Sequence, residues 1–191
     1  MLKITILKNI IKQHKPFFVF LLKFLVFYLV FTVLYKLFLN EFKMEKNEVD
    51  YITENVAEQT KVTLVFFGKD CEISKHEFEP SYKILYQGKY VARVIEGCNA
   101  ISVIILFASF IFAFSTSFGK TFLYIFLGSI LIYVLNFFRI ALLSVALYHF
   151  PQYEHVLHNI VFPLVIYGIV FLLWILWVTK ISGYVAKVTA K

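Results

Sequence analysis

The chain has 191 residues, of which 60% are hydrophobic and 19% are aromatic, and phenylalanine alone occurs 23 times. A soluble domain of this length could not bury so much apolar surface, whereas lipid can solvate it, so the composition predicts an integral membrane protein and excludes an ordinary soluble domain. The formal net charge of +7 is explained by membrane topology and requires no nucleic-acid partner.

Four apolar runs predict about four transmembrane helices. They cover approximately residues 17–39, 101–118, 121–148 and 160–178. Their lengths match the roughly 20 residues that cross a hydrocarbon core of about 30 Å, and helices are favoured because an open sheet in lipid leaves backbone groups unpaired. The first run is longer than a signal-peptide core and follows Pro16, so we interpret it as a retained anchor. Residues 1–191 are expected to form one membrane domain.

The segment at about 40–97 connects the first two predicted helices and has mixed charge. Residues 61–67, 82–86 and 87–95 have the composition of short strands, with Gln87-Gly88 as a hairpin turn. The expected fold is therefore an all-α membrane protein with a small extracytoplasmic α/β cap between helices 1 and 2.

The basic residues near the helix ends predict the orientation. On one side of the membrane we place the following: Lys3, Lys8, Lys12, Lys15, Lys120, Lys180, Lys187 and Lys191. All acidic residues fall between Glu41 and Glu96 or at Glu154. By the positive-inside rule both termini are cytoplasmic, and the segments 40–97 and 149–159 face outward.

Polar residues inside or beside the predicted helices are candidates for function, because charge in a membrane is costly. Arg139 lies within the third run, and Asn136 shares its helix face three residues earlier. A purely structural arginine that bonds backbone carbonyls is the alternative. Lys23 and Lys36 lie near the ends of the first run and can extend to the interface.

Cys98, Arg139 and two histidines approach the same outer membrane face from different predicted helices. Cys98 begins the second run, and His155 and His158 precede the fourth. A thiolate is a nucleophile, a nearby cation favours the thiolate, and imidazole transfers protons near neutral pH. Two alternatives remain open: a disulfide between Cys71 and Cys98, and histidines that are solvated loop residues.

Three short motifs in this order resemble those of the exosortase/archaeosortase family. They are Glu96-Gly-Cys98-Asn-Ala-Ile101, Asn136-Phe-Phe-Arg139-Ile140, and a histidine before the last apolar run. The short, aromatic-rich chain is similar to the compact F-type exosortases of Bacteroidetes, and the resemblance covers about residues 60–180. Larger members have about eight spans and a Ser-Gly pair after the cysteine, where this chain has Asn99-Ala100.

The resemblance implies a multi-pass cysteine transpeptidase or protease of the bacterial cytoplasmic (inner) membrane, with its active site facing the periplasm. Such an enzyme cleaves carboxy-terminal sorting signals of secreted proteins through a thioester acyl-enzyme. Each signal combines a short motif, a transmembrane helix and a basic tail. The expected partners are these secreted proteins, the lipid bilayer and an unidentified acceptor nucleophile, with no cofactor and no metal.

Carried over to this chain, the resemblance makes Cys98 the nucleophile and Arg139 the group that stabilises the thiolate or oxyanion. The proton-transfer role falls on His158, with His155 as the alternative, and Asn136 and Glu96 are possible supporting residues. A different class of function is also open: a non-enzymatic polytopic membrane protein, such as an assembly or transport partner, in which Arg139 lines a polar path.

Overall fold

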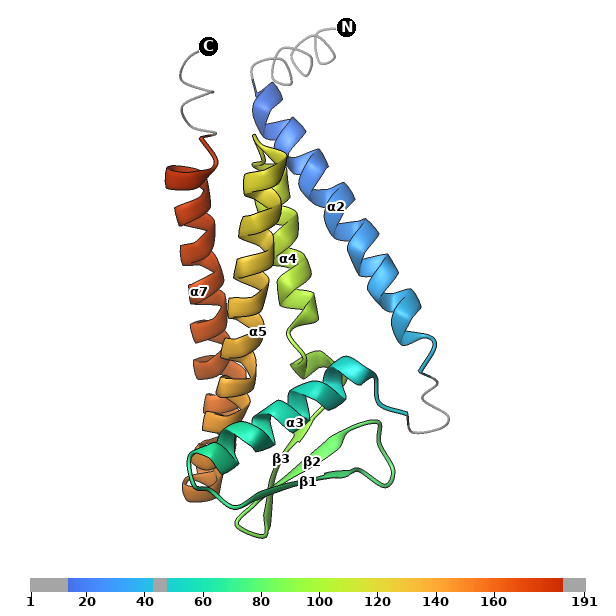
Figure 1. Ribbon diagram of the computed structural model, residues 1–191, viewed down its shortest axis with the longest axis vertical. Coiled ribbons are helices and arrows are strands. Elements are labelled where there is room, and N and C mark those ends of the chain that lie inside the picture. Colours follow the sequence, from blue (N-terminus) through green and yellow to red (C-terminus); the bar gives the residue numbers. More distant parts are fainter. Residues whose placement is uncertain (1–13, 43–47, 184–191) are drawn as a thin grey trace, which may run out of the picture.

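Four helices run alongside one another in the computed structural model, which describes residues 14–42 and 48–183, and a small sheet lies across one end of them (Figure 1). The four are α2 (Lys15–Leu39), α4 (Ile101–Ala113), α5 (Phe118–His149) and α7 (Phe162–Leu176). Three short helical turns precede α7: η3 (Pro151–Tyr153), α6 (Glu154–Val156) and η4 (Leu157–Val161). One more, η5 (Trp177–Ile181), follows it. The start of α2 and the end of η5 both lie at the end of the bundle away from the sheet.

Three of the helical stretches are long and apolar enough to cross a membrane: Lys15–Leu39, Phe118–His149 and Pro151–Ile181. The described part of the chain therefore indicates a multi-pass membrane protein. The predicted second span, 101–118, is divided in the structure. Its first 13 residues form α4, which is shorter than a spanning helix.

The chain turns after α4 because three polar residues follow one another at 115–117. Thr116 donates a hydrogen bond to the carbonyl of Ser182, and this bond ties the turn to the end of η5. The helix then restarts at Phe118, three residues before the predicted 121. The predicted orientation depends partly on Lys3, Lys8, Lys12, Lys187 and Lys191, which lie outside the described residues.

The cap contains a three-stranded antiparallel sheet with the order β1-β2-β3. Its strands are β1 (Cys71–Lys75), β2 (Tyr82–Tyr86) and β3 (Lys89–Val94). The predicted hairpin between β2 and β3 is confirmed. Gln87 and Gly88 both have positive φ, 50° and 72°, as a two-residue turn of this handedness requires. Strand β1 was not predicted.

The predicted strand at 61–67 is wrong, because these residues belong to helix α3 (Tyr51–Phe66). Asp50 caps this helix by accepting hydrogen bonds from the N–H groups of Ile52 and Thr53, each at 3.0 Å. The buried side chains recur at helical spacing: Thr53, Val56, Ala57, Thr60, Thr63 and Leu64. Many β-branched residues suggested a strand, but burial of this helical face outweighs their local preference.

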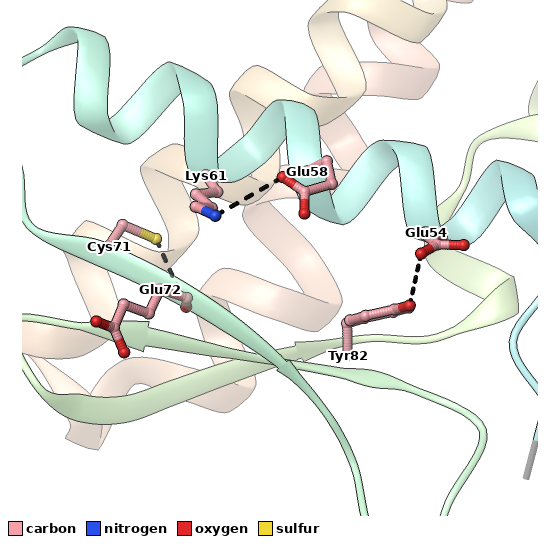
Figure 2. A network of polar contacts seen from close by, with 6 residues as sticks. All are labelled: Glu54, Glu58, Lys61, Cys71, Glu72 and Tyr82. Carbon is pink, nitrogen blue, oxygen red and sulfur yellow. Dashed lines mark hydrogen bonds and ion pairs between the residues drawn. The ribbon is translucent and has the colours of Figure 1, made fainter.

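Helix α3 packs on the sheet through apolar contacts in the core of the cap, and Figure 2 shows polar contacts of the helix and the sheet. The hydroxyl of Tyr82 on β2 donates a 2.9 Å hydrogen bond to Glu54 of α3. Burial, and then this hydrogen bond, raise the pKa of Tyr82 to about 12. Lys61 and Glu58 form a 3.9 Å ion pair within α3 near the sheet, and such a partly exposed pair adds little stability.

Helix α5 joins two hydrophobic cores. One core lies in the cap and combines buried residues of α3, the sheet and the C-terminal half of α5. The other lies in the bundle and combines buried residues of α4, α5, α7 and η5. Gly128, Ile132, Asn136 and Ile140 form a buried stripe at four-residue spacing along α5. Because this stripe runs from one core to the other, α5 holds the cap in a fixed relation to the bundle.

Candidate active site

Cys98 lies on a short 3₁₀ turn, η2 (Glu96–Cys98), between the end of β3 and the start of α4. Its N–H donates to the carbonyl of Ile95 at 2.8 Å. Its carbonyl accepts a 2.6 Å hydrogen bond from Nδ2 of Asn136, which is only 2% exposed on α5. The backbone of Cys98 is thus held both by its own turn and by a neighbouring helix.

The next residue, Asn99, links three helices around the same turn. Its Nδ2 donates to the hydroxyl of Tyr35 on α2 at 2.7 Å and to Oγ1 of Thr53 on α3 at 3.2 Å. Its Oδ1 accepts the N–H of Ile101, the first residue of α4, at 3.1 Å. Thr53 in turn donates to the carboxylate of Asp50 at 2.6 Å. These hydrogen bonds give the buried polar side chains of Asn99, Thr53 and Asp50 the partners that buried polar groups require.

Ala100 completes the turn in a left-handed conformation, with φ 65° and ψ 0°. For a residue with a Cβ this conformation costs about 1–2 kcal/mol relative to the right-handed region. The alanine here therefore carries strain at the junction between the cysteine and α4.

A cavity of about 220 Å³ brings together residues from the three motifs identified in the sequence. Cys98 comes from η2, Arg139 from α5 and His158 from η4. The cavity has the following lining: Val91, Ala92, Arg93, Ile95, Cys98, Arg139, Ile140, Leu143, Leu147, Glu154 and His158. Of the two histidines considered from the sequence, only His158 reaches this cavity. His155 is exposed and does not line it.

Arg139 is half-buried, and its Nε has no hydrogen-bond partner among the described residues. It also makes no ion pair within that part of the chain. A buried donor without a partner costs free energy and calls for an explanation. In this cavity the guanidinium can interact with a negative charge that forms beside Cys98, and the sulfur of a thiolate or an oxyanion would supply that charge.

His158 belongs to a π-helical segment, η4, that directly precedes α7, and Pro163 is the second residue of α7. Proline has no N–H to donate to the carbonyl four residues earlier, and a wider π turn is a common local adjustment. The exposed imidazole has its Nδ1 3.0 Å from Oδ1 of Asn159. It lines the cavity and is exposed to solvent, which suits a group that exchanges protons.

The two cysteines differ in environment, and both are free thiols. The disulfide alternative between Cys71 and Cys98 is therefore not present in this structure. Cys71 is buried in the core of the cap, and that burial raises the pKa of its thiol. Cys98 is half-buried and faces the cavity. On these grounds Cys98 is the thiol suited to reaction, because reactive cysteines are accessible and structural ones are not.

Two acidic residues at the site have different positions from those expected. Glu96 was a possible supporting residue, but it is exposed on η2 and does not line the cavity. Glu154, which the sequence indicated only as part of the acidic side, does line it. Its spacing of four residues before His158 could have identified it, because residues four apart share a helix face. Within the described residues no group of three or more His, Cys, Asp or Glu side chains could hold a metal ion.

Comparison with known proteins gives no assignment: no family model, curated protein or solved structure matches the chain.

Proposed function

We propose that this protein is an exosortase-like membrane cysteine transpeptidase or peptidase that cleaves the carboxy-terminal sorting signals of secreted proteins. The observation that carries the proposal is the cavity in which Cys98, Arg139 and His158 meet from three separate parts of the chain. The resemblance of the three motifs supplies the reaction class and the substrate.

In the proposed reaction His158 accepts the thiol proton of Cys98, and the sulfur attacks the carbonyl carbon of the scissile peptide bond. The tetrahedral intermediate carries a negative charge on oxygen, which Arg139 stabilises in the cavity. The C–N bond then breaks, His158 gives a proton to the leaving amine, and a thioester to Cys98 remains. An acceptor amine or water attacks this thioester and regenerates the thiol.

The proposed topology has α4 as a fourth, short span, with the cap on the periplasmic side of the bacterial inner membrane. The 13 residues of α4 rise only about 20 Å, less than the roughly 30 Å of a hydrocarbon core. The outer end of α4, where Cys98 lies, is then recessed below the membrane surface under the cap. A substrate with its own membrane helix would present its scissile bond at this depth.

Co-expression with candidate substrates tests the proposal. The candidates are secreted proteins from the same genome that end in a membrane helix and a basic tail. We expect a gel shift of at least one candidate with the wild-type enzyme and none with Cys98→Ala. The matched control is Cys71→Ala, which should process the substrate like the wild type, because Cys71 lies outside the cavity.

The histidine pair offers a second matched comparison on the same gel. His158→Ala should slow processing strongly, by about 100-fold or more as is typical for loss of a general acid-base group. His155→Ala should have little effect. Processing that persists in Cys98→Ala at equal enzyme levels would refute the proposed chemistry, and an unreactive Cys98 thiol would favour a non-enzymatic membrane partner instead.

A further inference from the structure

Strand β3 is an edge strand beside the candidate active site. β2 pairs with one of its edges, and no strand of the described chain pairs with the other. An unpaired edge presents a row of free N–H and C=O groups to any extended chain that can reach it. Lys89, Arg93 and the register irregularity opposite Ile84 and Leu85 limit indiscriminate pairing at this edge.

A second cavity, of about 320 Å³, continues the active-site cavity along this strand. It is lined by five consecutive residues of β3, Lys89 to Arg93, and by Leu147, Pro151 and Glu154. Lys89 and Tyr90 are regular neighbours on the strand, as are Ala92 and Arg93, and the two side chains of each pair point to opposite faces. A cavity that touches both members of each pair therefore lies along an edge of the strand. Because β2 occupies one edge, this cavity lies along the free one.

The two cavities share lining residues and so form one path. Val91, Ala92 and Arg93 line both, together with Leu147 of α5 and Glu154 of α6. One end of the path lies at Lys89, beside the hairpin turn, and the other end lies at Cys98. The path therefore follows β3 from Lys89 to Arg93 and ends at Cys98.

We infer that the free edge of β3 binds the substrate as an added strand. This inference rests on the proposed function and identifies how that site recognises its substrate. The occupant is the extended peptide segment that precedes the substrate's membrane helix. Main-chain hydrogen bonds to β3 supply affinity, and the cavities accept alternate side chains.

The direction of the added strand follows from the topology. β3 leads through Ile95 into the Cys98 turn and then into α4. A sorting signal also runs from its exposed motif into its membrane helix. Substrate and β3 thus approach the membrane in the same direction, so the added strand is parallel to β3.

Site-directed disulfide trapping tests this inference. The enzyme carries Cys98→Ala and Cys71→Ala, so that substrate is not cut and no native thiol remains. One new cysteine is placed at a time, as Val91→Cys or Arg93→Cys. The probe is a reporter whose carboxy-terminal segment the wild-type enzyme cleaves, with single cysteines scanned through the residues before its membrane helix. The control is Ser74→Cys, an exposed position on β1, the other edge strand.

We expect each β3 position to select one best partner in the reporter. On moving from Val91→Cys to Arg93→Cys, the best partner should shift by two residues toward the reporter's membrane helix, and Ser74→Cys should not cross-link. A shift in the opposite sense, or cross-linking no stronger at β3 than at Ser74→Cys, overturns the inference while leaving the proposed function intact. If the wild-type enzyme cleaves no reporter at all, both proposals fail.

Discussion

Replacement of Asn99 by alanine should destabilise the protein more than the same replacement of an exposed asparagine. The side chain is 2% exposed and makes three hydrogen bonds, to Tyr35, Thr53 and the N–H of Ile101. A buried hydrogen bond contributes about 1 kcal/mol net, so the loss of three predicts a fall of about 3 kcal/mol in the free energy of unfolding. Asn55→Ala is the matched control, because that side chain is exposed on α3; it should change stability by less than about 0.5 kcal/mol.

A double-mutant cycle separates the network from the general effect of truncation. Tyr35→Phe removes only the hydroxyl that accepts from Asn99, and should cost about 1 kcal/mol. Together with Asn99→Ala it should cost about 1 kcal/mol less than the sum, because the two residues share one hydrogen bond. Equilibrium unfolding in detergent measures all three variants. Strict additivity, or an Asn99→Ala protein as stable as the Asn55→Ala control, would refute the reasoning.

Three further predictions concern the packing, the backbone and the pH dependence of the fold. A Cβ at Gly128 would overlap the ring of Phe107, so Gly128→Ala should lower stability by about 1–3 kcal/mol. Phe107→Leu in the same chain should restore part of this loss. If Gly128→Ala costs as much stability with Phe107→Leu as without it, the reasoning is contradicted. Ala100→Gly should raise the unfolding free energy by about 0.5–1 kcal/mol, because glycine adopts the positive φ without strain, and a loss of stability on thermal unfolding would argue against strain there. Since the pKa of Tyr82 is raised to about 12 by burial and by Glu54, the neutral phenol favours the fold, so stability should fall as pH rises from about 10 to about 12. Tyr82→Phe should remove that part of the alkaline loss in a pH series of unfolding curves.

The elements that the sequence predicted correctly depend on local signals. Long apolar runs identified the three candidate spans, and Gln87-Gly88 identified the hairpin because both residues tolerate or favour positive φ. Helix α3 was missed because its sequence contains many β-branched residues, which favour a strand. Only the packing of its buried face on the sheet shows that the helix forms instead. The polar turn at 115–117 was missed because three polar residues change the mean hydropathy of a long apolar run very little.

The candidate site was predictable where motifs marked it and not where distant contacts form it. Cys98, Arg139 and His158 were indicated by residue type and order, and the cavity brings them together. The partners of Asn99 were not predictable, because Tyr35 and Thr53 lie 64 and 46 residues away in the sequence. The hydrogen bond from Asn136 to the carbonyl of Cys98 likewise depends on how α5 passes the turn.

The short connection between β3 and the Cys98 turn couples binding to chemistry. β3 ends at Val94 and the turn begins at Glu96, so only Ile95 separates them. Hydrogen bonds of Asn136 and Asn99 also hold the turn, which leaves the backbone of Cys98 little freedom relative to the strand. A peptide paired with β3 would therefore bring its carbonyl to Cys98 with most of the positioning entropy already lost on binding. On this reasoning, loosening the turn with Asn136→Ala should slow cleavage more than it weakens substrate binding, and kcat and KM measured separately would distinguish the two effects.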